Sequence, residues 1–548
     1  IAMSDEEKNI IFGGPQITDF TKFVGSLGEL LLFQLNTNQD KVGIIDGITG
    51  RKVTYKEIKE KALHLAEYFR QNGIKAGDVI GICSENRLEF PYTVYGALLV
   101  GATITTINLL YTEREMIHTI QLTRPKVIFG TELAIERLTD VARKCSGVEK
   151  IIQYGDKALV NGIPVFNDIL NDKRYAKPEE DFVHPPEDLD RSALIMMSSG
   201  TTGLPKGVQI TERNILSTLA QSVDARNELY QEEVELIILS IIPWFHVYGL
   251  MTLISSSIGG IILISLPRFD EHLFLSSIEK YRATHVFMVP PLMVFLAKHP
   301  LVSKYDLSSL KELYCGAAPL SKEVEKAVMD RIPNITAIRQ GFGLSETTLS
   351  VLSTRGVKTK PGSVGIVSIG TYCKVIDPET GKILGPNEAG ELCFKGPQIM
   401  KGYMGNDSAT RDTIDSDGWF HTGDVGYFDE EKFFFIVDRL KELIKYKAFQ
   451  VPPAELEDLL VSHPKVADAA VIGLPDENAG ELPMAFVVKQ PKVDVTEKEI
   501  KDYIASKVTN YKQLRGGVRF INEIPKNPSG KILRRELRLL VKNPQSKL

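Results

Sequence analysis

The chain has 548 residues, a length that predicts two or more domains. Its composition, with 43% hydrophobic and 25% charged residues, is typical of a soluble globular protein. A formal net charge of −5 argues against a broad nucleic-acid-binding surface. The five cysteines are scattered without a CxxC pair, so they suggest neither a disulfide framework nor a zinc site and fit a reducing compartment.

Two segments share one pattern, beginning at Gly101 and at Gly260. Each has a β-rich run, a break, an amphipathic helix signal (residues 113–122 or 271–281) and a second β-rich run at the same spacing. Strand, helix and strand in this order are typical of the βαβ unit of a mostly parallel sheet. The pattern predicts two related α/β subdomains; the alternative is chance similarity between ordinary α/β segments.

A short apolar run at residues 193–197 predicts a buried strand, and the loop SSGTTGLPKG follows it at residues 198–207. Small residues let backbone N–H groups approach an anion, hydroxyls donate further hydrogen bonds, and Lys206 offsets negative charge. The P-loop pattern is not met because Gly207, not Ser or Thr, follows the lysine. The loop therefore predicts a phosphate site of another kind, with a flexible surface loop as the alternative.

The richest apolar run covers residues 249–267, but serines and glycines interrupt it. It falls short of the roughly 18 uninterrupted apolar residues that a membrane span needs. We expect a buried helix and strand there, and no membrane span.

Three further motifs offer groups that suit a nucleotide. YCGAAPL at residues 314–320 has small residues against which a flat group can lie, and QGFGLSET at 340–347 offers Phe342 for stacking and Glu346 as a hard Mg²⁺ ligand. In WFHTGD at 419–424, Asp424 could accept hydrogen bonds from a ribose diol, and Arg439 could reach the same ribose. The structural alternatives are a core aromatic for Phe342, a turn-capping Asp and a surface ion pair.

The chain changes character after residue 362, where short alternating runs flank turn residues and predict a small antiparallel sheet or barrel. A charged junction at residues 438–441 predicts a hinge. Beyond it, helices at 453–460 and 496–508 and strands at 466–472 and 484–488 predict an α+β domain. Lys531 lies in a small-residue loop of this domain, so it becomes useful only if the domain folds over the nucleotide site.

Eight motifs in order resemble those of the adenylate-forming superfamily of acyl-CoA synthetases, 4-coumarate–CoA ligases and beetle luciferases: SSGTTGLPKG, PWFHVYG, YCGAAPL, QGFGLSE, WFHTGD, VDRLKELIKYK, VPPAELE and PKNPSGK. The match runs over nearly the whole chain and looks closest to the insect luciferase-like fatty acyl-CoA synthetases. The resemblance implies an α/β fold with a large N-terminal domain (1–438) of two doubly wound subdomains and a β-barrel (about 362–438), then a mobile α+β C-terminal domain (439–548).

The resemblance also implies roles for individual residues. The ATP phosphates would be held by Ser198, Ser199, Gly200, Thr201, Thr202, Gly203 and Lys206, with Thr201 and Glu346 near Mg²⁺. The adenine and acyl site would be formed by Tyr248, Cys315, Gly316, Ala317, Ala318, Gln340, Gly341, Phe342, Gly343, Leu344, Ser345 and Leu349, with Phe342 stacked on adenine. Asp424 and Arg439 would bind ribose, His246 would lie beside the acyl carboxylate, Lys531 would stabilise the adenylation transition state, and Lys445 with Lys447 would lie on a second face that admits coenzyme A.

Two departures from the family pattern bear on the substrate. Ala448 stands where the family usually has Gly, and its methyl narrows the expected thiol channel. Leu349 stands where luminous beetle enzymes typically have Ser, and it offers an apolar wall instead of a polar network.

The preferred interpretation is an ATP-dependent, AMP-forming ligase that joins a medium- or long-chain fatty acid to coenzyme A. The alternatives are a luciferase, which includes weak latent activity with luciferin, and a 4-coumarate–CoA ligase. A binding module without catalysis is disfavoured because the catalytic set is present. We expect a monomer. The terminal Ser546-Lys547-Leu548 matches the peroxisomal address, so a peroxisomal import receptor is an expected partner.

Overall fold

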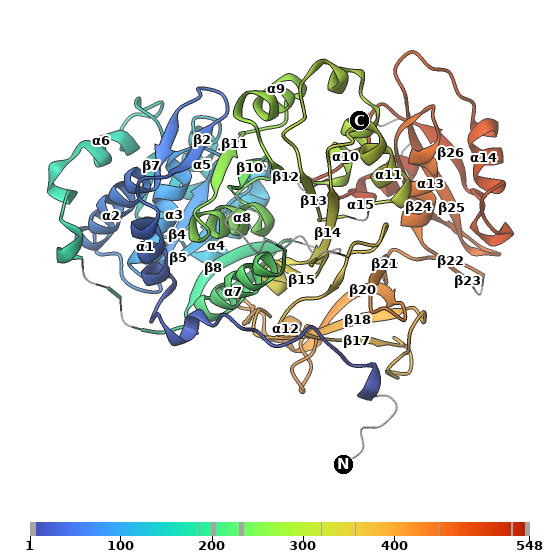
Figure 1. Cartoon of the computed structure of the whole chain (residues 1–548), viewed down its shortest axis with the longest axis horizontal. Helices are drawn as coiled ribbons and strands as arrows, with labels where there is room; N and C mark the ends of the chain where they lie inside the picture. The colour runs from blue at the N-terminus through green and yellow to red at the C-terminus, as the bar shows by residue number, and fades with distance from the viewer. Residues whose placement is uncertain are drawn as a thin grey trace.

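The structure, a computed structural model, describes residues 7–182, 184–185, 187–198, 204–229, 235–318, 320–356, 358–447, 449–527 and 530–542. Two large mixed sheets, a small antiparallel sheet and a C-terminal sheet follow one another across the molecule (Figure 1).

The first large sheet has seven strands in the order β19-β9-β8-β5-β4-β6-β7. Its strands are β4 (Val79–Cys83), β5 (Thr103–Thr106), β6 (Val127–Gly130), β7 (Lys150–Gln153), β8 (Ser192–Ser198), β9 (Lys206–Thr211) and β19 (Gly402–Tyr403). The helices that accompany it along the chain are α1 (Leu27–Thr37), α2 (Tyr55–Gln71), α3 (Glu89–Leu99), α4 (Glu113–Thr123), α5 (Ile135–Ala142) and α6 (Phe166–Asn171). The buried strand predicted before the phosphate loop is confirmed as β8.

The second large sheet has nine strands in the order β16-β15-β14-β13-β12-β10-β11-β2-β3. They are β2 (Val42–Asp46), β3 (Lys52–Thr54), β10 (Ile237–Ser240), β11 (Ile262–Ser265), β12 (His285–Met288), β13 (Glu312–Cys315), β14 (Ala337–Gly343), β15 (Ser350–Ser353) and β16 (Ile366–Val367). Its helices are α7 (Glu212–Leu229), α8 (Val247–Ile258), α9 (Glu271–Tyr281), α10 (Pro290–Lys298) and α11 (Lys322–Arg331). The apolar run at 249–267 is thus a buried helix and strand, as expected.

The predicted internal repeat is confirmed. The first sheet contains the order β5-β4-β6 and the second contains β11-β10-β12, so each half crosses over in the same way. The matching helices α4 and α9 both end in a left-handed residue, Arg124 with φ 47° and Arg282 with φ 54°. Each arginine reverses the chain into the following parallel strand.

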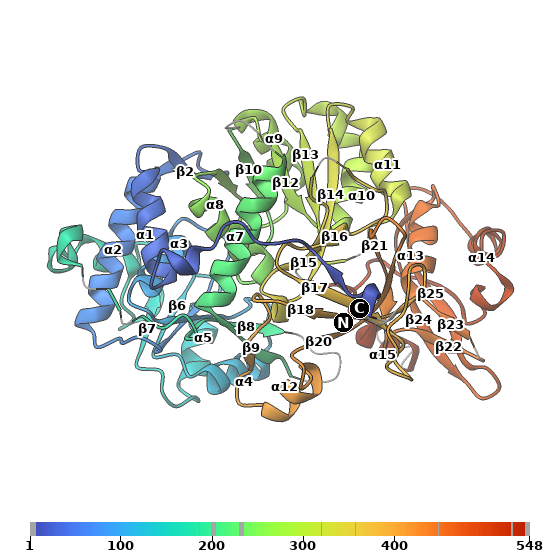
Figure 2. The same ribbon diagram turned by 60° about the horizontal axis from the view of Figure 1, so that its bottom comes forward.

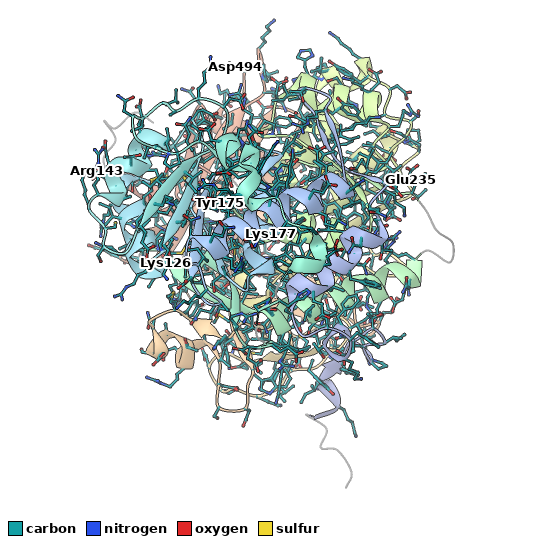
Figure 3. All side chains as sticks on the ribbon, turned by 90° about the vertical axis from the view of Figure 1, so that its left-hand side faces the viewer. Lys126, Arg143, Tyr175, Lys177, Glu235 and Asp494 are labelled. Atoms are coloured by element: carbon teal, nitrogen blue, oxygen red, sulfur yellow. The ribbon has the colours of Figure 1, made fainter. Side chains whose placement is uncertain are left out.

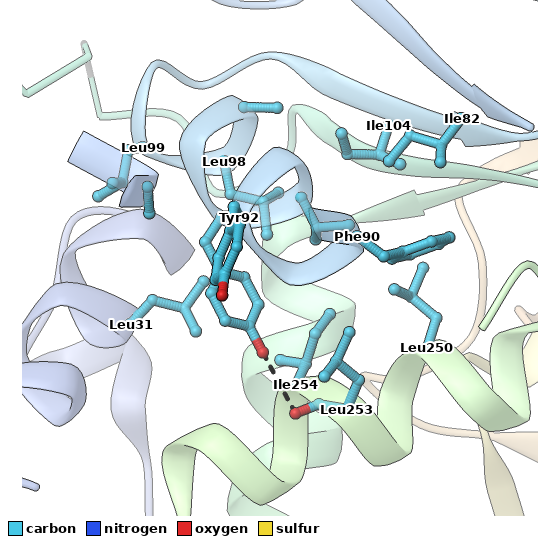
Figure 4. Packing of buried hydrophobic residues seen from close by; sticks show 14 of the residues in the cluster. Leu31, Ile82, Phe90, Tyr92, Leu98, Leu99, Ile104, Leu250, Leu253 and Ile254 are labelled. Carbon is cyan, nitrogen blue, oxygen red and sulfur yellow. Dashed lines mark hydrogen bonds between the residues drawn. The ribbon is translucent and has the colours of Figure 1, made fainter. Parts of the chain in front are cut away.

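The largest hydrophobic cluster joins the two halves. Helix α3 packs between α2 and α8, and Phe90, Leu250, Leu253 and Ile254 meet in the contact (Figure 4). The Tyr95 hydroxyl donates to the Leu253 carbonyl oxygen at 3.3 Å, so the buried phenol is satisfied. This packing holds the two sheets in a fixed relation on either side of the site described below.

The small antiparallel sheet has the strand order β1-β17-β18-β20-β21. Its strands are β1 (Ile11–Phe12), β17 (Tyr372–Ile376), β18 (Gly390–Lys395), β20 (Phe420–Phe428) and β21 (Phe434–Arg439), with helix α12 (Asp407–Thr413) between β18 and β20. The prediction located this unit but missed β1, because the N-terminal segment crosses α7 to reach it (Figure 2). Asp224 of α7 fixes that crossing by accepting the backbone N–H groups of Ile17 and Thr18.

The C-terminal unit is built on β22 (Ile444–Tyr446), β23 (Phe449–Val451), β24 (Val466–Asp476), β25 (Gly480–Lys489) and β26 (Gly517–Phe520) with α13 (Pro453–Ser462), α14 (Glu497–Ala505) and α15 (Arg534–Lys542). The predicted helices and central strands are confirmed, while β22, β23, β26 and α15 were missed. Half of the predicted hinge is strand: Asp438 and Arg439 end β21, where Arg439 pairs with Asp424. Leu440 and Lys441 lie in the turn that follows, and the N–H of Leu440 donates to the Gly423 carbonyl oxygen.

Figure 3 views the end of the molecule opposite the C-terminal unit. Two of the labelled lysines form ion pairs: Lys126 with Asp78 at 2.8 Å and Lys177 with Glu67 at 2.8 Å. Within the described ranges, each helix is either too short or too polar to traverse a lipid bilayer.

Candidate active site

A cavity of about 750 Å³ lies where the two large sheets, the small sheet and the C-terminal unit meet. Each of these four parts contributes residues to the cavity lining. The residues predicted from the sequence that line it are Ser198, Lys206, His246, Tyr248, Cys315, Gly316, Ala317, Gln340, Gly341, Gly343, Leu344, Ser345, Glu346, Leu349, Arg439 and Lys531.

The predicted phosphate loop joins two antiparallel strands. Ser198 at the end of β8 is the register partner of Lys206 at the start of β9. A P-loop instead leads from a strand into a helix whose N-terminus faces the phosphates, so the expectation of another kind of loop is confirmed. Ser199, Gly200, Thr201, Thr202 and Gly203 lie outside the described residues, and their phosphate and metal roles stay predictions.

Glu346 and Lys206 meet at Tyr403. The Tyr403 hydroxyl donates to Glu346 Oε1 at 2.9 Å, and Lys206 Nζ lies 4.5 Å from the centre of the Tyr403 ring. Glu346 is buried, and burial together with this carboxylate raises the pKa of Tyr403. Tyr403 therefore acts as a donor that orients the carboxylate toward the cavity.

Tyr403 was missed because its position depends on a long-range pairing. Strand β19 pairs with β9, so Tyr403 is opposite Val208 and comes beside the phosphate loop. The sequence around it shows only a Gly-Tyr pair at a turn, which carries no signal of that pairing.

Asp424, Arg439 and Lys531 form a second polar group. Asp424 and Arg439 are register partners, with Arg439 Nε 3.4 Å from Asp424 Oδ1. Burial raises the pKa of Asp424 to about 6, against the opposing effect of Arg439 and Lys531. Burial, and then repulsion from Arg439, lowers the pKa of Lys531 to about 8. Lys531, which the C-terminal unit supplies, thus lies at the cavity, as the resemblance implied.

Small residues and an unusual backbone keep one side of the cavity open. Ala317 has φ 71°, a left-handed conformation that costs energy for a residue with a Cβ. At Gly343 a Cβ would lie 1.7 Å from the Leu349 carbonyl oxygen, so only glycine fits there. Gly341 and Gly343 line the cavity, and the intervening Phe342 instead packs toward Phe394, with ring centres 6.2 Å apart.

His246 precedes α8 and faces the cavity. Its Nε2 is buried and makes no hydrogen bond to any described residue. Burial lowers the pKa of His246 to about 4, so its imidazole is neutral near pH 7. A neutral imidazole can donate a hydrogen bond to a substrate carboxylate.

Residues of α7 and α8 line a further part of the cavity, called the aliphatic arm below, in which polar side chains (Thr218, Gln221, Ser222, Thr252, Ser255 and Ser256) interrupt the apolar ones. Its apolar wall consists of Leu219, Val223, Leu236, Ile238, Ile242, Val247, Ile258, Ile261 and Leu349. Two arginines also face it. Arg339 is neutralised by Glu312 through two contacts of 2.7 and 2.9 Å, and Arg226 donates to the Gly259 carbonyl oxygen at 3.3 Å. The sequence analysis missed these polar residues because nothing local marks them.

Four predicted site residues do not belong to the described cavity lining: Ala318, Phe342, Asp424 and Lys445. Asp424 still touches the lining through Arg439. Lys445 is exposed on β22, where its backbone N–H donates to Glu481 at 2.8 Å. An exposed position outside the cavity is compatible with the second face predicted for Lys445.

The site combines a loop between two strands, the buried carboxylate of Glu346 and Lys531 from a separate C-terminal unit. This combination is typical of enzymes that activate carboxylic acids with ATP. Comparison with known families agrees: residues 33–404 match the AMP-binding enzymes, and residues 455–531 match the AMP-binding enzyme C-terminal domain. The chain belongs to this family of adenylate-forming enzymes, which confirms the resemblance and the α/β fold class.

Two activities are named among the relatives that are most similar in sequence. The chain is 42% identical over 513 residues to a luciferin 4-monooxygenase of Nipponoluciola cruciata, covering 92% of each chain. It is 44% identical over 497 residues to that of Photinus pyralis, covering 89% of each. A probable 4-coumarate–CoA ligase of Dictyostelium discoideum is 39% identical over 524 residues, covering 93% of this chain and 94% of the relative.

Solved structures share the fold. ATP-bound MatB from Rhodopseudomonas palustris superposes with a TM-score of 0.83 at 25% identity, covering 95% of this chain and 100% of that one. The anthranilate CoA ligase AuaEII with anthranoyl-AMP superposes with a TM-score of 0.87 at 23% identity, covering 96% and 99%. At this sequence identity, the similarity to AuaEII supports the fold alone.

Proposed function

We propose that this adenylate-forming ligase joins a medium- or long-chain fatty acid to coenzyme A. The observation that carries the proposal is the aliphatic arm beyond His246. An alkyl chain gains roughly 0.8 kcal/mol for each CH₂ that it buries, so such a wall favours a flexible apolar acid. Leu349 adds to this wall at the position where a serine would offer a hydroxyl.

In the first half-reaction the acid carboxylate attacks the α-phosphorus of ATP, the bond to the β-phosphate breaks, and pyrophosphate leaves with acyl-AMP remaining. The carboxylate is a weak nucleophile that approaches a polyanion, so positioning and charge compensation dominate. His246 orients the acid, Lys206 compensates charge on the phosphates, and Lys531 compensates the charge that develops at the α-phosphorus. Asp424 with Arg439 fixes the ribose.

The residues present suit Mg²⁺ as the cofactor. Glu346 offers a hard carboxylate oxygen that Tyr403 orients, and Thr201 is the second expected ligand. Bound Mg²⁺ would neutralise the phosphates that Lys206 and Lys531 face.

For the second half-reaction we propose that the C-terminal unit rotates near Lys441, which withdraws Lys531 and presents Lys445 and Lys447. The thiol of coenzyme A then attacks the acyl carbonyl carbon, AMP leaves and the thiol proton is released. This rotation breaks hydrogen bonds between the two units: Asp438 Oδ2 accepts the Ala454 N–H at 2.9 Å, and Lys298 Nζ of α10 donates to the carbonyl oxygens of Val461 at 2.6 Å and Val466 at 3.3 Å. Ala448 lies outside the described residues, so its effect on the channel stays a prediction.

A luciferase is the second candidate, because relatives that are 42% and 44% identical carry that activity. It shares the adenylation step, so adenylation alone does not separate the two. The 4-coumarate–CoA ligase relatives make an aromatic acid the third substrate to test.

A single panel tests the proposal. Pyrophosphate release is measured with C8 to C18 fatty acids, coumarate and D-luciferin, with and without coenzyme A, while light is recorded. We expect fatty acids to give the highest kcat/KM and to yield acyl-CoA and AMP. Faster turnover of luciferin with bright light, or of coumarate, together with no response to fatty acids would overturn it.

We further propose a peroxisomal location through Ser546-Lys547-Leu548, which lies outside the described residues. A fluorescent protein fused to the N-terminus should report punctate peroxisomal signal, and deletion of Leu548 should disperse it. Diffuse signal from the full-length fusion would refute the address.

A further inference from the structure

We propose that Glu391, Cys393 and His421 form a binding site for a zinc-class transition-metal ion. Their ligand atoms all lie within 4.8 Å of one another. Cys393 Sγ is 3.5 Å from His421 Nδ1, which is 3.1 Å from Glu391 Oε2. The cysteine spacing gave no zinc pattern, because the ligands come from two strands that pair only in the folded protein.

The sheet geometry puts the three side chains on one face. Cys393 of β18 is the register partner of His421 of β20. Glu391 lies two residues before Cys393, so it points to the same side of the strand. The register shifts between Glu391 and Cys393, and this irregularity lets the carboxylate turn toward the histidine.

The distances agree with tetrahedral coordination. Zinc bonds of roughly 2.3 Å to sulfur and about 2.0–2.1 Å to nitrogen or oxygen separate neighbouring ligand atoms by about 3.3–3.6 Å. Two of the separations, 3.5 and 3.1 Å, require only a small adjustment, and the third, between Cys393 Sγ and the Glu391 carboxylate, is within 4.8 Å. One thiolate, one imidazole and one carboxylate suit Zn²⁺ and not Mg²⁺ or Ca²⁺, which prefer oxygen ligands.

Asp415 provides the outer support that such histidines have. His421 Nε2 lies 3.4 Å from Asp415 Oδ2, on the opposite side of the ring from Cys393. Asp415 Oδ1 accepts the backbone N–H groups of Trp419 at 2.8 Å and Asp417 at 2.9 Å, so its orientation is fixed. A carboxylate that accepts the second ring N–H leaves Nδ1 as the metal-binding nitrogen.

The site has an entry path and a route to the nucleotide. Glu391 and His421 line the cavity, while the Cys393 thiol is buried behind them. Glu391 Oε1 also accepts the backbone N–H of Gly423 at 2.9 Å, one residue before Asp424. A bound metal competes for this carboxylate, so we expect metal occupancy to weaken ATP binding.

The test uses the full chain and Co²⁺ as a spectroscopic probe. Titration should give one equivalent of a thiolate-to-cobalt charge-transfer band that Zn²⁺ abolishes. Cys393→Ala, Cys393→Ser and His421→Gln should lose the band, and Asp415→Asn should weaken Co²⁺ binding at least tenfold. The matched control is Cys145→Ala, since Cys145 is a half-buried thiol in the loop between α5 and β7 and outside the cluster, and it should keep the band.

Thermal unfolding of each metal-free variant verifies that the fold is intact. No band in the wild-type chain, a band that survives in folded Cys393→Ala and Cys393→Ser, or a band lost in folded Cys145→Ala would overturn the site. A Zn²⁺-loaded, desalted enzyme should show at least a threefold higher KM for ATP. If the cobalt band is present but the KM for ATP is unchanged, the metal site stands and its coupling to ATP binding is refuted. The cobalt readout does not depend on which acid the enzyme activates.

Discussion

Replacement of Lys531 by Ala separates the two half-reactions. A unit charge about 4 Å from the charge that develops in the transition state contributes roughly 4 kcal/mol at an effective dielectric constant of about 20. Since about 1.4 kcal/mol corresponds to a tenfold change in rate, we expect a loss of roughly 10³-fold in adenylation. Lys531 is half-buried at the cavity, where the charge of Asp424 acts on it.

The assay measures pyrophosphate release from ATP and fatty acid, and separately acyl-CoA formation from supplied acyl-AMP. The second rate should change less than about threefold, because the lysine is withdrawn in that step. Lys531→Arg keeps the charge and should retain more adenylation than the alanine variant. Lys526→Ala is the matched control: it lies in the same loop, but its ammonium pairs with Asp468 at 2.6 Å within the C-terminal unit.

Two results would refute the reasoning. An equal loss in both half-reactions would show that Lys531 holds the nucleotide or the fold and does not act on one face only. A loss of less than tenfold in adenylation would show that its charge is not positioned at the reacting phosphate.

Three further predictions concern the cavity. The kcat/KM for adenylation should rise with pH through about 6, as Asp424 ionises, and fall above about 8, as Lys531 loses its proton; a flat profile from pH 5 to 9 would contradict these assignments. Tyr403→Phe removes a buried hydrogen bond of roughly 1.5–3 kcal/mol to Glu346, so kcat/KM for ATP should fall about 10- to 100-fold, and an unchanged value would exclude the orienting role. Arg226→Leu makes the aliphatic arm more apolar and should shift the chain-length profile toward longer acids, with an unchanged C8 to C18 profile counting against a chain in that arm.

Local patterns predicted most of the fold. The 3.6-residue and two-residue periodicities of apolar side chains located the repeated βαβ units, the strand before the phosphate loop and the main C-terminal helices and strands. They missed β1, β19 and β26, which are short or pair with strands far away in the chain. A short strand is stabilised by its partner, so its own sequence carries a weak signal.

The candidate site divides in the same way. Lys206, Glu346 and Lys531 lie in sequence motifs whose residue types predict phosphate or metal binding. Tyr403, Arg226 and the Arg339–Glu312 pair carry no such motif, and they reach the cavity through register and helix packing. Likewise, no spacing along the chain brings Cys393 to His421.

By itself, the sequence determined the two related α/β halves and the family of adenylate-forming enzymes, and it predicted the phosphate loop, because hydrophobic period and loop composition are local properties. The tertiary structure alone decided that Lys531 reaches Asp424, that His246 is neutral, and that a buried tyrosine orients Glu346. These depend on burial and on distances between segments that are not neighbours in the sequence, and desolvation and hydrogen bonding act only once those segments are in contact.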